Sequence, residues 1–171
     1  VEELRLDTEL HSAIGDEQFF AAYQPQLDLR TGRVVGVEAL ARWTHPELGA
    51  ISPLIFIPLA EMNGLIMEIG RLMLVTACRD VRRWREQGLD IGVSVNVSGA
   101  QLEQPDFADR TLQILFDEAM PLERLTLEIT ESRSLIDEQP ALNHLRRLAD
   151  LGINIAIDDF GTGFSSLTRL V

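Results

Sequence analysis

The stretch INIAIDD, residues 153–159, decides the fold class. It is apolar at nearly every position and ends on two aspartates, a pattern typical of a buried strand. Residues 91–97 (IGVSVNV) and residues 125–130 (LTLEIT) have the same character. Helical patterns at residues 107–119 and 140–151 separate the three strands. Strand and helix therefore alternate, which predicts an α/β fold of parallel strands joined by crossover helices.

The first part of the chain predicts a helix and a hairpin. Residues 1–14 have an apolar helical face and are followed by Gly15, a natural helix stop. Residues 19–29 and 34–43 have the composition of strands and flank the turn pair Thr31-Gly32. We therefore expect these two strands to form an antiparallel hairpin.

The segments between the hairpin and the alternating region predict a loop and two helices. Residues 45–53 are rich in Pro and Gly and predict a loop, whereas residues 55–62 and 65–87 predict helices. The pair Gln24-Pro25 lies inside the first strand of the hairpin. Because proline cannot donate to a strand ladder, it predicts a strand end or a bulge at which Gln24 faces a ligand.

Composition limits the class of protein. The 171 residues are enough for about one domain, and 46% are hydrophobic, so a core can form. The net charge of −12 argues against binding of a DNA or RNA duplex through a general basic surface. The single cysteine, Cys78, excludes a disulfide within the chain and fits a reducing compartment. No apolar stretch approaches the ~20 residues that span a bilayer, and residues 1–5 lack the apolar core of a signal peptide.

Polar side chains occur on four successive predicted strands, each at or near the C-terminal end of its strand: Glu38, Asn96, Glu128, Asp158 and Asp159. The last three of these strands follow one another at intervals of about 30 residues, the length of one strand–helix unit. Parallel strands bring such residues to the same end of a sheet, where α/β folds bind ligands.

Converging carboxylates repel one another unless a cation neutralises them. The donor atoms are all oxygens, which favours Mg²⁺, Mn²⁺ or Ca²⁺ over zinc or copper. Asp158 and Asp159 are adjacent, so they can bridge two ions, an arrangement suited to hydrolysis of a phosphate diester. The alternative is ordinary: a strand glutamate facing water, or a buried ion pair with Arg42, Arg124 or Arg146.

Two further features bear on an anionic ligand. The glycine-bracketed residues 159–166 follow a strand and can cradle a phosphate or move as a lid, or can simply form a strand-to-helix turn. Arg42 lies four residues after Glu38 and is the obvious cation for an anionic ligand, with a surface salt bridge as the alternative.

Six motifs in order along residues 19–170 resemble the EAL domain, whose name is the tripeptide Glu38-Ala39-Leu40. They are YQP (23–25), EALARW (38–43), FIPLAE (56–61), SVNVS (94–98), LEITES (127–132) and DDFGTGFSSL (158–167). The resemblance implies a TIM-like (β/α) barrel with an antiparallel first strand. It also implies a bacterial phosphodiesterase that linearises cyclic di-GMP to pGpG in second-messenger signalling, with Mg²⁺ or Mn²⁺ as two ions.

The same resemblance assigns roles to residues. The first metal would be held by Glu38, Asn96, Glu128 and Asp158, and Asp159 would help with the second. Glu131 would hold the glycine loop that contains Gly161, Thr162 and Gly163. Arg42 would contact a substrate phosphate, and Gln24 and Leu40 would line the substrate groove. Glu38, Glu131 and Asp159 are the catalytic candidates.

A full barrel takes about 250 residues, so we expect residues 16–171 to hold about five of the eight strands, the N-terminal two thirds of the domain. The family's later strands supply a catalytic lysine and further glutamates, so the 171 residues alone are expected to lack activity. Residues 1–15 resemble a lead-in helix from an upstream GGDEF or sensor domain.

The expected partners are cyclic di-GMP and a second copy of the chain in a homodimer. The expected location is the cytoplasm, alone or as part of a membrane-anchored regulator. The alternative functions are an inactive cyclic di-GMP receptor and a dimerisation module. Degenerate members usually lose metal ligands, and none of these ligands is missing here, which favours catalysis.

Overall fold

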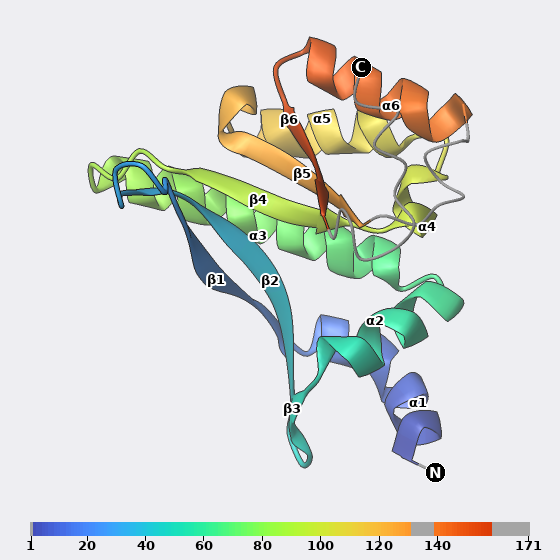
Figure 1. The fold of residues 1–171 in the computed structure, drawn as a ribbon. Coiled ribbons are helices and arrows are strands. Elements are labelled where there is room, and N and C mark those ends of the chain that lie inside the picture. Colours follow the sequence, from blue (N-terminus) through green and yellow to red (C-terminus); the bar gives the residue numbers. More distant parts are fainter. Residues whose placement is uncertain (1, 131–138, 159–171) are drawn as a thin grey trace.

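The computed structural model describes residues 2–130 and 139–158 of the chain (Figure 1). The elements are α1 (Glu2–Gly15), β1 (Phe19–Leu27), β2 (Val34–His45), β3 (Gly49–Ile51), α2 (Pro53–Met62), α3 (Ile66–Glu86), β4 (Gly92–Val97), α4 (Gly99–Leu102), α5 (Phe107–Asp117), a 3₁₀ turn (Leu122–Arg124), β5 (Leu125–Thr130), α6 (Gln139–Asp150) and β6 (Asn154–Asp158).

One twisted sheet organises the described residues. Its strand order is β1-β2-β4-β5-β6, and β3 pairs with β2 outside this path. The pair β1–β2 is antiparallel, whereas β2–β4, β4–β5 and β5–β6 are parallel. The predicted hairpin and the predicted parallel strands are both confirmed, and the mixed α/β architecture is that of an incomplete TIM-like barrel.

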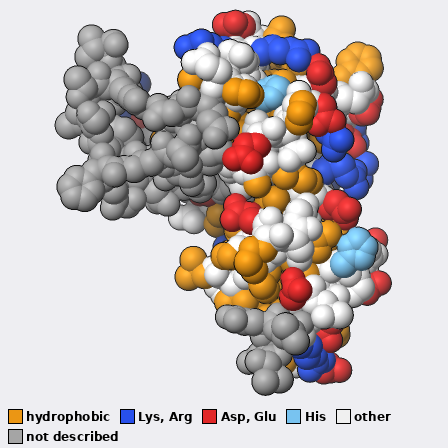
Figure 2. All heavy atoms as spheres, turned by 90° about the vertical axis from the view of Figure 1, so that its right-hand side faces the viewer, with side chains coloured by type: hydrophobic (Ala, Val, Ile, Leu, Met, Phe, Trp, Pro, Cys, Tyr) orange, Lys and Arg blue, Asp and Glu red, His pale blue; other side chains and the backbone are white. Residues whose placement is uncertain are grey.

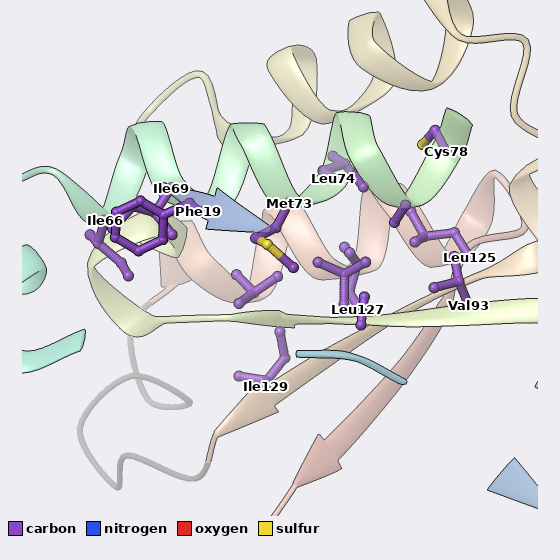
Figure 3. Close-up of a cluster of buried hydrophobic side chains, with 14 of the residues drawn as sticks. Phe19, Ile66, Ile69, Met73, Leu74, Cys78, Val93, Leu125, Leu127 and Ile129 are labelled. Carbon is purple, nitrogen blue, oxygen red and sulfur yellow. The ribbon is translucent and has the colours of Figure 1, made fainter. Parts of the chain in front are cut away.

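Apolar residues alternate along the central strands and face the helices. Val93 and Val95 of β4 are buried, as are Leu125 and Leu127 of β5. Figure 3 shows these strands beside Met73 and other apolar side chains of α3. Because side chains on a strand alternate between faces, the residues between them point to the opposite face of the sheet. That opposite face carries the polar candidates.

Helix α1 is fixed to the rest of the structure by buried leucines and by a polar contact. Leu6 and Leu10 lie in the core. At the end of β2, His45 is only 4% exposed, and its Nε2 lies 2.5 Å from Glu9 Oε2. The Nδ1 atom of His45 accepts the backbone N–H groups of Glu47 and Leu48, both at 3.1 Å. Since Nδ1 accepts, the ring proton is on Nε2, and this N–H group donates a hydrogen bond to Glu9 Oε2.

The predicted loop at residues 45–53 was partly wrong. Strand β2 continues to His45, and β3 returns beside it with Ile51 opposite Trp43. His45 closes the turn between the two strands with its ring nitrogen, a role that composition alone does not reveal.

The strand does not end at Pro25 either. β1 continues to Leu27, and the register shift falls between Gln26 and Leu27. A proline is tolerated at this position because β1 is the edge strand of the sheet that the structure describes.

Among the described residues, no helix is long and apolar enough to cross a bilayer.

Candidate active site

The strand register places four polar side chains on one face of the sheet. Glu38 of β2 pairs with Ser94 of β4, and Asn96, two residues further along β4, pairs with Glu128 of β5. Paired residues share a face, as do residues two apart on one strand. One row of candidates therefore crosses three neighbouring strands, on the face opposite to that covered by α3.

Glu38 and Asn96 are in direct contact. The Asn96 Nδ2 donates a hydrogen bond of 2.8 Å to Glu38 Oε1. Both side chains are half-buried. This bond uses the nitrogen of the amide and one carboxylate oxygen. Asn96 Oδ1 and Glu38 Oε2 take no part in it, and both are oxygen donors of the kind that Mg²⁺ and Mn²⁺ prefer.

Glu128 is held from the far edge of the sheet. Gln26 Nε2 lies 3.2 Å from Glu128 Oε1 and 3.2 Å from Ser94 Oγ. Neither Gln26 nor Ser94 was selected from the sequence. The period-2 rule contained the signal, because Gln26 follows Gln24 by two residues and Ser94 precedes Asn96 by two. Only the fold shows that these side chains meet.

The three candidates for substrate contact lie beside this row on the β1–β2 hairpin. Gln24 is directly opposite Glu38, and it is exposed. Leu40 and Arg42 follow Glu38 at intervals of two, so they share its face. Arg42 is half-buried, and its Nη1 donates to the backbone oxygen of Ala41 at 2.9 Å. No ion pair of Arg42 occurs among the described residues.

The remaining candidates are described only in part. The backbone of Asp158 pairs with Thr130 at the end of β6, one step further along the direction of the row. The other five candidates lie outside the described residues: Glu131, Asp159, Gly161, Thr162 and Gly163. Within residues 2–130 and 139–158, no group of three or more His, Cys, Asp or Glu side chains is close enough to hold a metal ion. Within these described residues, Glu38 and Glu128 do not by themselves form such a group.

Tyr23 anchors the hairpin that carries Gln24 and Gln26. Its hydroxyl donates to Asp80 of α3 at 2.5 Å, and its ring packs edge-on against Trp84 at 4.8 Å. Burial, and then the bond to the Asp80 carboxylate, raise the pKa of Tyr23. The phenol therefore stays protonated and continues to fix β1 against α3.

The surface reflects the acidic composition. In Figure 2, acidic side chains are spread over the face shown, and basic side chains form small groups among them. Many of the basic side chains are already paired with carboxylates, such as Arg79 with Glu118 and Arg147 with Asp109. These pairs partly neutralise the basic groups of the described surface.

Comparison with known proteins identifies the family. The model of the EAL domain matches residues 7–171. The chain is 41% identical over 170 residues to the bifunctional diguanylate cyclase/cyclic di-GMP phosphodiesterase MucR of Pseudomonas aeruginosa, covering 99% of this chain and 25% of that protein. It is 40% identical over 164 residues to a cyclic di-GMP phosphodiesterase of the same organism, covering 95% of this chain and 28% of that protein.

Solved structures agree with this assignment. A structure described as the MucR phosphodiesterase in complex with cyclic di-GMP superposes with a TM-score of 0.89 at 39% identity. The match covers 98% of this chain and 67% of that one. The chain thus spans about a quarter of the length of the two curated relatives above. With a family model that matches almost its whole length, this chain belongs to the EAL domain family.

Proposed function

We propose that the protein containing this chain hydrolyses cyclic di-GMP to linear pGpG in bacterial second-messenger signalling. The observation that carries the proposal is the row formed by Glu38, Asn96 and Glu128 on one sheet face. Its residues are the metal-ligand candidates of the EAL family, and the family model matches residues 7–171. Two relatives carry the name cyclic di-GMP phosphodiesterase, which supports the choice of substrate.

The donor set fits a divalent ion. The hydrogen bonds between described residues use Glu38 Oε1, Glu128 Oε1 and Asn96 Nδ2, and leave Glu38 Oε2, Glu128 Oε2 and Asn96 Oδ1 as oxygen donors. They are hard ligands, and two of them are charged, as Mg²⁺ or Mn²⁺ requires. We propose that these residues and Asp158 hold the first ion, and that Asp159 helps to hold a second. Such ions supply Lewis-acid stabilisation of phosphate oxygens.

The other candidates would bind and orient the substrate. Arg42 would pair with a phosphate oxygen, because it lies on the same face of β2 as Glu38, four residues further along the strand. Gln24 and Leu40 would line the groove beside it. Glu131 would hold the glycine loop that contains Gly161, Thr162 and Gly163.

One relative supports a proposal about the domain that accompanies this chain. MucR carries a diguanylate cyclase activity in the same chain as its phosphodiesterase. We propose that a GGDEF or sensor domain likewise precedes α1, which would then be a lead-in helix. A homodimer stays a prediction.

The test is turnover of cyclic di-GMP by the intact protein with Mg²⁺ or Mn²⁺, followed by chromatography of the products. We expect pGpG from the wild type and its loss in Glu38→Ala. The matched control is Glu86→Ala, which changes an exposed glutamate at the C-terminal end of α3, the helix on the opposite face of the sheet. It should keep full activity.

Other outcomes separate the alternatives. Nucleotide binding without pGpG would contradict the proposal and indicate a receptor. If the protein neither binds nor hydrolyses the nucleotide, the result would indicate a dimerisation module. Equal activity of Glu38→Ala and wild type would show that the row is not the catalytic site.

A further inference from the structure

Gln26 reaches across the sheet to a candidate metal ligand. It lies on the edge strand β1, and β2 and β4 separate it from β5. Its Nε2 nevertheless lies 3.2 Å from Glu128 Oε1 on β5 and 3.2 Å from Ser94 Oγ on β4. Ser94 is 3% exposed, and Gln26 and Glu128 are half-buried. The contact is therefore partly shielded from water, and its Ser94 end is buried.

The backbone provides a path for this side chain. Gln26 is opposite Gly36 on β2, and Gly36 is in turn paired with Gly92 on β4. A Cβ at Gly36 would lie 3.1 Å from Gln26 Oε1 and 3.3 Å from the Gly92 carbonyl oxygen. The absence of a side chain at Gly36 thus leaves the room that the Gln26 amide occupies.

A register shift follows at once. Leu27, the next residue, pairs with Val34, so the regular ladder is interrupted directly after Gln26. Irregularities of this kind bend a strand and re-aim a side chain. The register shift and the space at Gly36 both affect the position of the Gln26 side chain.

The chemical effect falls on Glu128. An amide that donates to one oxygen of a carboxylate fixes the plane of that carboxylate and leaves the other oxygen for a further ligand. Groups that hold metal ligands in this way typically contribute 10–100-fold to metal affinity or activity. Gln26 also donates to Ser94, so rotation of its amide is restricted from two sides.

We propose that Gln26 is a positioning residue, which orients Glu128 for a divalent ion through its Nε2 donor, and that Gly36 is small so that it can do so. The proposal rests on the proposed function, because it takes Glu128 to be a metal ligand. Gln26 lies directly after the motif YQP (23–25) and is not among the site residues expected from the sequence.

The test measures Mn²⁺ binding to the intact protein by electron paramagnetic resonance, without substrate. Gln26→Met keeps the length of the side chain and removes its donor, and should weaken Mn²⁺ binding by about 10–100-fold. Gly36→Ala keeps the glutamine and crowds it, and should weaken binding in the same direction. Gln113→Met is the control, since Gln113 also donates to a carboxylate, that of Asp117 at 2.8 Å, but on α5. It should bind Mn²⁺ as the wild type does.

A second measurement separates positioning from folding. The variants should keep the wild-type circular dichroism spectrum, and Gln26→Met should recover activity at high Mn²⁺, since only the affinity for the ion has fallen. Unchanged Mn²⁺ affinity in Gln26→Met, with loss of binding in Glu128→Ala, would overturn the role of Gln26 alone. Unchanged affinity in Glu128→Ala would overturn the metal site itself, and with it the proposed function.

Discussion

His45 offers a quantitative test of how β2, the strand that carries Glu38 and Arg42, is held in place. The ring is buried, and its Nδ1 accepts two backbone N–H groups in the turn to β3 while Nε2 bonds Glu9 of α1. In His45→Leu both N–H groups lose their acceptor. In His45→Asn the side-chain oxygen takes the place of Nδ1, so the turn keeps its acceptor and only the contact with Glu9 is lost.

The magnitude follows from the two bonds. Leaving a buried donor unpaired costs about 1–3 kcal/mol. Glu47 and Leu48 belong to an exposed turn, where water can approach once the turn opens, so the lower value applies to each. The sum is about 2 kcal/mol, which corresponds to a roughly 30-fold change in an opening equilibrium.

Hydrogen exchange with peptide-resolved mass spectrometry measures this local opening in the intact protein. We expect exchange in the peptide over residues 43–52 to accelerate about 30-fold in His45→Leu and to stay near the wild-type rate in His45→Asn. Exchange in α1 should accelerate in both variants, because both lose the Glu9 contact. Equal acceleration of the turn in both variants would refute the acceptor role of Nδ1.

Four further results are expected. Burial raises the pKa of the Cys78 thiol to about 12, so a maleimide should label it only after unfolding; rapid labelling of the native protein would contradict its placement. Leu127→Ala removes a side chain that is 1% exposed and should cost about 2.7–5.0 kcal/mol of unfolding free energy in chemical denaturation; a loss below 1 kcal/mol would argue against the packing of β5 on α3. The hydrogen bond from Arg79 lowers the pKa of Glu118, so this carboxylate stabilises the fold at neutral pH and loses its contribution as the pH falls through its lowered pKa, and Glu118→Gln should show a weaker acid dependence in thermal melts. Arg42→Ala should raise the KM for cyclic di-GMP while leaving Mn²⁺ affinity unchanged, and loss of Mn²⁺ binding would contradict its role as a phosphate contact.

Much of the fold follows from local pattern. The apolar runs of β4, β5 and β6 and the helices between them predict parallel strands, and the register of the sheet confirms that pairing. Period-2 alternation then places Glu38, Asn96 and Glu128 on one face, and the bond between Glu38 and Asn96 confirms that two of them meet.

The features that could not be predicted depend on contacts between distant segments. His45 has no local pattern that marks it as the acceptor of a turn, and β3 is too short to show alternation. Pro25 is tolerated because β1 lies at an edge, which only the strand order shows. Gln26 acquires its contact from a register shift and from the room at Gly36, both of which belong to the assembled sheet.

A crystal structure of the intact protein grown with cyclic di-GMP and Mn²⁺ would locate the ion by anomalous scattering. We expect a manganese peak within about 2.0–2.6 Å of oxygen atoms from Glu38, Asn96 and Glu128, with a phosphate of the nucleotide beside it. A nucleotide bound elsewhere, or manganese bound away from these three side chains, would contradict this expectation.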